Sequence, residues 1–160
     1  MMLVPFVTFV LVFAVQWRAS AEEQLPVLLW LMVGTTTASG AVHAGVTPHH
    51  LHEAALLGWA MAVMCLVQLG WAVWLLLTPR TRLVEVGVLG NLGVVVLWAW
   101  TRLLGVPFGI AGGLRQRVGP WDVTCTLLEV TAVLAGLAWL SGLRLPLPRA
   151  GRLSSTAVYR

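Results

Sequence analysis

The sequence predicts an all-α integral membrane protein, a helical bundle with five transmembrane helices. Hydrophobic residues make up 59% of the 160 residues and charged residues only 10%, whereas about a quarter of the residues in soluble domains are charged. Several windows of about 20 apolar residues match the length that a bilayer core of about 30 Å requires of a spanning helix. We expect a single membrane domain over residues 1–142, followed by a basic, disordered cytoplasmic tail over residues 143–160.

The polar breaks between apolar windows place the spans at about 2–17, 25–44, 49–77, 83–104 and 120–141. The first span has no positive charge before it and is followed by Arg18, which favours a retained anchor with its N-terminus outside. The segment RASAEE after it resembles a cleavage site, and cleavage would leave four spans.

The second span changes halfway from bulky to small and hydroxylated residues, which predicts a helix in the bundle interior. The pair Thr47-Pro48 predicts the start of the next helix, since a capping hydroxyl is followed by a proline in the first turn. The two later spans begin after the polar segments TPRTR and RQRVGP.

The arginines predict the orientation, because cytoplasmic loops are enriched in positive charge. One side of the membrane would hold seven arginines: Arg18, Arg80, Arg82, Arg144, Arg149, Arg152 and Arg160. The other side would hold three: Arg102, Arg115 and Arg117. This asymmetry predicts a multi-pass protein of the plasma membrane (the bacterial inner membrane) with a cytoplasmic C-terminus and an extracytoplasmic histidine-bearing turn.

Composition and missing motifs exclude several classes of function. The ten cationic residues are dispersed along the chain, whereas a nucleic-acid-binding surface needs a clustered basic patch. No P-loop, Rossmann glycine pattern, CxxC pair, HExxH motif or serine-nucleophile elbow is present in the sequence. We therefore expect no nucleic-acid partner and assign no catalytic residue, and the sequence favours a protein that is not an enzyme. The bilayer is the expected partner, with a homo-oligomer or a larger membrane complex as further options.

All four histidines lie within ten positions, from His43 to His52. On a helix that begins at Pro48, His50 and Glu53 would share the face that points into the bundle, together with Met61, Met64 and Gln68, whereas His49 and His52 would not. Polar faces are also predicted on three other spans: Thr36, Ser39 and His43; Asn91, Trp98 and Arg102; and Asp122, Cys125, Thr126 and Glu129. Among the carboxylates Glu129 would lie deep, about 10 Å beyond Asp122 at 1.5 Å per residue.

An ionisable side chain at membrane depth costs a few kcal/mol and usually faces another polar group or a water-filled cavity. Imidazoles and carboxylates that meet at one place suit a divalent ion such as zinc, iron, manganese or copper. The residues predicted as metal ligands are His43, His50, Glu53 and Glu129. Three further residues are expected to orient these ligands: Asp122, Arg102 and Asn91.

Three other interpretations remain open at this point. His43 and His50, on adjacent helices, could be the axial ligands of a haem. The same groups could form a proton relay in a conduit or a transporter subunit. Finally, the histidine–glutamate pairs could be interhelical hydrogen bonds in a packing subunit of a larger complex.

The order of the polar positions resembles a family of small multi-pass membrane proteins of actinobacteria whose activity is uncharacterised. The resemblance covers about residues 40 to 135 and depends on His43 and three segments: PHHLHE (Pro48, His50, Glu53), NLGVVVLWAWTRLLGVPFG (Asn91, Trp98, Arg102, Gly105, Pro107, Gly109) and GPWDVTCTLLE (Gly119, Asp122, Glu129). Members of that family tend to have an acidic residue where this chain has His49. The resemblance implies no activity, but it selects the same positions as helical geometry.

Overall fold

The computed structural model describes residues 27–105 and 115–143, and these form an all-α structure. Its four helices are α2 (Val27–Glu53), α3 (Ala55–Leu77), α4 (Thr81–Leu103) and α5 (Pro120–Leu140). Each is long and apolar enough to cross a membrane. The expected span at 2–17, its possible cleavage, and the tail beyond residue 143 lie outside the described residues.

Large apolar side chains cover the outer surface of the bundle. Among those that are more than half exposed are Trp59, Leu66, Trp74, Leu89, Leu127 and Leu134. A soluble protein rarely exposes so much contiguous apolar surface, whereas lipid tails solvate it. The described helices therefore have the surface of a membrane bundle.

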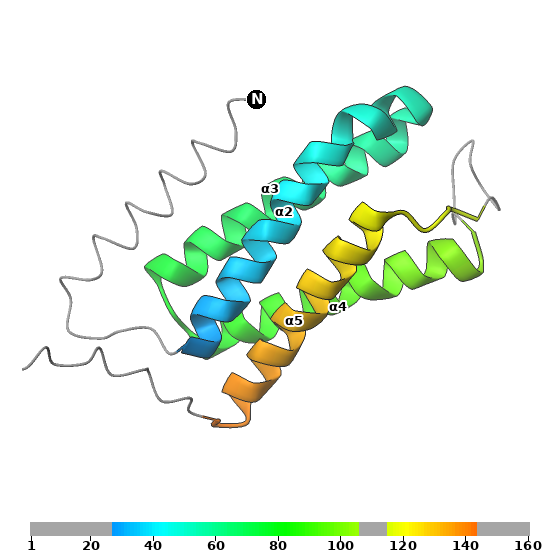
Figure 1. The fold of residues 1–160 in the computed structure, drawn as a ribbon. Coiled ribbons are helices and arrows are strands. Elements are labelled where there is room, and N and C mark those ends of the chain that lie inside the picture. The colour runs from blue at the N-terminus through cyan, green and yellow to red at the C-terminus, as the bar shows by residue number, and fades with distance from the viewer. Residues whose placement is uncertain (1–26, 106–114, 144–160) are drawn as a thin grey trace, which may run out of the picture.

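Consecutive helices run in opposite directions (Figure 1). Helix α2 packs against both α3 and α5, and α5 also packs against α4, whereas α3 and α4 make few contacts with each other. The prediction that the small and hydroxylated span lies in the bundle interior is thus confirmed.

The apolar core lies near the turn between α3 and α4. All four helices contribute to it: Leu29, Met32 and Val33 from α2, Trp71, Leu75 and Leu76 from α3, Leu83, Val84 and Val88 from α4, and Ala132 and Ala135 from α5. The Trp71 indole donates a hydrogen bond to the Leu83 carbonyl oxygen at 2.9 Å, which ties α3 to the start of α4. Gly87 and Gly136 permit this packing, since a Cβ at Gly87 would overlap the Trp71 ring and one at Gly136 would overlap Val88.

The predicted helix start at Thr47-Pro48 is wrong, because α2 continues through Pro48 to Glu53. The Thr47 hydroxyl does not cap a new helix but donates to the carbonyl oxygen of His43 at 2.7 Å. The chain turns instead at Ala54, which has extended backbone angles. Gly58 makes the turn compact, because a Cβ there would overlap Leu51. His49, His50 and Glu53 consequently lie at the end of α2 and not at the start of α3.

Candidate metal centre

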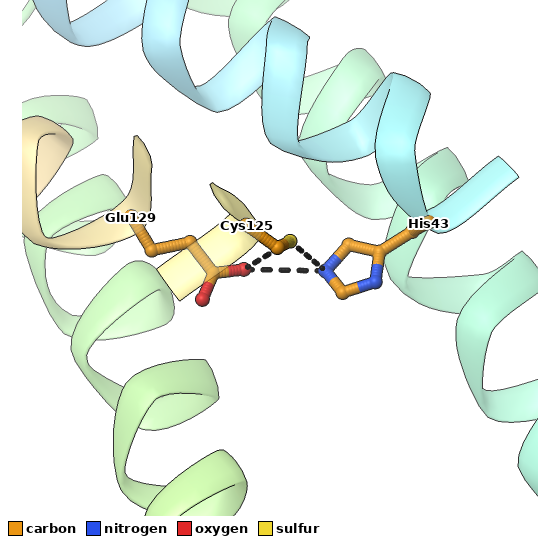
Figure 2. Close-up of side chains that lie close together, drawn as sticks. All are labelled: His43, Cys125 and Glu129. Carbon is orange, nitrogen blue, oxygen red and sulfur yellow. Dashed lines mark hydrogen bonds and ion pairs between the residues drawn. The ribbon is translucent and has the colours of Figure 1, made fainter. Parts of the chain in front are cut away.

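Three buried side chains from two helices meet inside the bundle (Figure 2). His43 comes from α2, and Cys125 and Glu129 come from α5. The two α5 residues are four positions apart, so they lie one helical turn from each other on the face that α5 presents to α2. His43 is 7% exposed, Cys125 6% and Glu129 1%.

The potential ligand atoms of these side chains form a tight triangle. His43 Nε2 lies 3.2 Å from Glu129 Oε1 and 3.4 Å from Cys125 Sγ. The third edge, from Cys125 Sγ to Glu129 Oε1, is 3.6 Å. Among the described residues, no other group of three or more histidine, cysteine and acidic side chains places its ligand atoms close enough together to share one metal ion.

Two further polar side chains hold the carboxylate of Glu129 in place. The Ser39 hydroxyl, one turn before His43 on α2, donates to Glu129 Oε1 at 2.9 Å and lies 3.1 Å from Cys125 Sγ. The Gln68 amide, from α3, donates to the same carboxylate oxygen and to Ser39 Oγ, both at 3.3 Å. Residues from three helices therefore converge on one oxygen atom of Glu129.

Met61 fixes the orientation of the His43 ring. Its thioether sulfur lies 3.3 Å from Nδ1 of His43. A thioether can only accept a hydrogen bond, so a proton on Nδ1 would satisfy this contact and leave Nε2 free to bind a metal ion. The lone pair of Nε2 is then directed toward the thiol and the carboxylate, and fixing the ring in this way through its second nitrogen is typical of metal-binding histidines.

The structure brings together only part of the predicted ligand set. His43 and Glu129 meet, whereas His50 and Glu53 do not belong to the buried group. These two contact each other at the end of α2, where the Glu53 side chain is 51% exposed. The haem interpretation started from adjacent helices, and that premise is wrong because His43 and His50 both lie on α2, seven residues or about 10 Å apart.

The three residues expected to orient the ligands contact other groups. Arg102 Nη2 of α4 donates to Asp122 Oδ1 of α5 at 2.5 Å, and Asp122 Oδ2 accepts from the Gly119 backbone N–H at the start of α5. Asn91 donates to Thr36 Oγ1 at 3.2 Å, which joins α4 to α2. None of these bonds reaches His43 or Glu129, so the three residues connect helices and do not position the buried group directly.

The residues that complete the cluster were visible in the sequence only as members of polar faces. Ser39 shares a face with His43, and Cys125 shares one with Glu129, but neither was selected as a ligand. Gln68 was expected beside His50 and Glu53, and it contacts Ser39 and Glu129 instead. The missing information was which faces meet, because that depends on the packing of α2 between α3 and α5.

Comparisons with protein-family models, curated proteins and solved structures found no match to this chain. The chemistry of the cluster must therefore be inferred from its geometry. In a nucleophilic cysteine site, the thiol and the orienting acidic or amide group use different nitrogens of the histidine. Here both Cys125 and Glu129 face Nε2, while Nδ1 faces Met61. Convergence on one side of the ring is the arrangement of ligands around a common ion.

Proposed function

We propose that this chain is an integral membrane protein that binds one divalent transition-metal ion through His43 Nε2, Cys125 Sγ and Glu129 Oε1. The observation that supports the proposal is the triangle of these atoms, with edges of 3.2, 3.4 and 3.6 Å in the interior of an apolar bundle. In a tetrahedral zinc site, bonds of about 2.0–2.1 Å to nitrogen and oxygen and about 2.3 Å to sulfur separate the ligand atoms by about 3.3–3.6 Å. The cluster is already close to the size that such an ion requires.

Hydrogen bonds alone would link the three ligand atoms less completely than a metal ion would. Without a metal ion, a neutral cluster places two protons on the triangle, either as an imidazolium–carboxylate pair with a thiol or as an imidazole with a carboxylic acid and a thiol. Two protons can fill only two of the three edges. One metal ion bonds to all three ligand atoms at the same time, while Ser39 and Gln68 still donate to the carboxylate.

The charge of the ligands favours a divalent ion. A coordinated thiolate and a coordinated carboxylate contribute one negative charge each, and a neutral imidazole contributes none. A divalent ion therefore makes the site neutral, and neutrality matters because a net charge at membrane depth costs several kcal/mol. Zinc, cobalt and iron all accept this mixture of nitrogen, oxygen and sulfur ligands, whereas copper(I) would leave one negative charge.

A proton conduit is less well supported by the same contacts. A relay through His43 needs a proton donor or acceptor at each ring nitrogen. Nδ1 faces the Met61 sulfur, which does not pass a proton onward.

The four apolar helices support a membrane location. We propose that this membrane is the plasma membrane and that the α2–α3 turn is outside, as the distribution of arginines indicates.

Elemental analysis of the detergent-purified full-length chain tests the proposal. We expect about one equivalent of zinc or another divalent transition metal in the wild type, and its loss in Cys125→Ser. The matched control is Cys65→Ser, since Cys65 is also buried but lies on α3 outside the triangle. Cobalt loading provides a second measurement, because a cobalt–thiolate bond produces a charge-transfer absorption band. A wild type that binds no metal even when zinc or cobalt is supplied would refute the proposal.

A further inference from the structure

Ser39 is a fourth buried side chain in contact with the triangle. Its hydroxyl oxygen lies 2.9 Å from Glu129 Oε1 and 3.1 Å from Cys125 Sγ, and the residue is fully buried. Ser39 precedes His43 by one turn of α2, just as Cys125 precedes Glu129 by one turn of α5. Two facing helices therefore each contribute an i, i+4 pair of side chains to the same cluster.

Three protein ligands leave one position of a tetrahedral ion unfilled. In zinc enzymes this position holds water or substrate, whereas structural zinc sites fill it with a fourth side chain. The cluster is closed to solvent, since its four side chains belong to residues that are at most 7% exposed. The Ser39 hydroxyl has lone pairs like those of water, and it already contacts two of the three ligand atoms. Coordination by this hydroxyl also leaves the charge of the site unchanged, because the hydroxyl is neutral and keeps its proton.

We propose that Ser39 Oγ is the fourth ligand and that the metal centre is a closed clasp between α2 and α5. This inference rests on the proposed function. The distances of 2.9 and 3.1 Å from Ser39 Oγ to the carboxylate and the thiol need to lengthen by only a few tenths of an ångström to reach the spacing of about 3.3–3.6 Å in a tetrahedral site. The Gln68 amide supports the coordinated oxygen, since it donates to Ser39 Oγ at 3.3 Å.

The position of the clasp gives the ion a structural role. Helix α2 packs against α3, and α5 packs against α4, whereas α3 and α4 make few contacts with each other. The contact between α2 and α5 therefore joins the two halves of the bundle (Figure 1). An ion with two ligands from each of these helices holds the α2–α3 pair to the α4–α5 pair.

Cobalt-loaded protein shows whether the fourth ligand is Ser39 or water. The full-length chain is loaded with Co²⁺ in water enriched in the magnetic isotope of oxygen, and hyperfine spectroscopy detects labelled oxygen bound to the ion. We expect no labelled water on cobalt in the wild type, and bound labelled water in Ser39→Ala, where the fourth position is open. Thr36→Ala is the matched control, since Thr36 is a buried residue about one turn earlier on α2 whose hydroxyl bonds to Asn91. Identical spectra of the wild type and Ser39→Ala would overturn the assignment.

A thiol at the same position provides a second test. Ser39→Cys should add a second cobalt–thiolate bond, so the charge-transfer absorption per bound cobalt should roughly double. Thr36→Cys adds a buried thiol to the same helix outside the cluster and should leave the band unchanged. A band of wild-type intensity in Ser39→Cys would also overturn the assignment. Failure of the proposed function gives a different result, because the wild type itself would then bind no cobalt, and the assignment of Ser39 would fail with it.

Discussion

Met61 contacts a proposed metal ligand but is not itself one, so a change at Met61 tests the orientation of His43 without removing a ligand. Its sulfur contacts Nδ1 of His43, the nitrogen that faces away from the triangle. Met61→Leu keeps the volume, at a typical cost below about 1.5 kcal/mol, but removes the acceptor that orients the ring. We expect metal affinity to fall by about tenfold, as for other groups that support a metal ligand, with the fold retained.

Competition with a chromophoric chelator measures this affinity. Met64→Leu is the matched control, because Met64 is a partly buried methionine on the same helix that is not hydrogen-bonded to His43. Equal affinities of the wild type and Met61→Leu would show that the sulfur does not orient the ring.

Glu129 is predicted to matter more for metal binding than for folding. Glu129→Gln has the same shape and can still accept from Ser39, but it provides a poor ligand in place of a carboxylate. In thermal unfolding in detergent, zinc at about 100 times its Kd should stabilise the wild type by about 2.7 kcal/mol. It should not stabilise the variant. A zinc-dependent increase in Tm of similar size in Glu129→Gln would exclude this carboxylate as a ligand.

The sequence predicted individual residues of the site better than their partners. Glu129 was identifiable because a carboxylate within an apolar span is costly unless it is paired, and His43 was identifiable by its polar face. Cys125 was not selected, since a cysteine in an apolar helix is usually a small apolar side chain. Its role became evident only from its distance of 3.4 Å to His43 Nε2, which depends on how α2 and α5 pack.

At the scale of the helices, the apolar windows predicted α4 and α5 to within a few residues. The predicted end of α2 was wrong because Thr47-Pro48 often starts a helix, where the missing N–H of proline costs no hydrogen bond, whereas here Pro48 lies inside α2. In this chain the helix continues, with the Thr47 hydroxyl bonded to the His43 carbonyl oxygen. That error placed His50 and Glu53 on the wrong helix, and it explains why they were expected in the interior.

Packing between α3 and α4 gives the next prediction. A Cβ at Gly87 would overlap the Trp71 ring, whereas a Cβ at Gly90, on the same helix, would have no neighbour within 4 Å. Gly87→Ala should therefore destabilise the bundle by about 1–3 kcal/mol, the usual cost of overpacking. Gly90→Ala adds the same methyl group and the same helix propensity without the clash, so it should be neutral or slightly stabilising. Thermal unfolding of both variants in detergent makes the comparison, and equal Tm values would show that Trp71 moves aside at no cost.

For the whole molecule, an apolar surface indicates that the helices are surrounded by lipid, but it does not show in which direction they cross the membrane. The four described helices expose large apolar side chains along their length, and this surface is the same whichever end faces the cytoplasm. Direction depends instead on the flanking charges, since positive loops are retained on the cytoplasmic side. The α3–α4 turn is flanked by Arg80 and Arg82, and we propose that this turn is cytoplasmic and that the α2–α3 turn is outside.

Cysteine labelling in intact cells tests this orientation. In a background with Cys65→Ser and Cys125→Ser, His52→Cys at the end of α2 should react with a membrane-impermeant maleimide added outside. Arg82→Cys should react only after the membrane is opened, because its side of the bundle faces the cytoplasm. Both positions are exposed, so accessibility within the fold does not bias the comparison. The opposite pattern would place the α2–α3 turn in the cytoplasm and the α3–α4 turn outside, against the distribution of arginines.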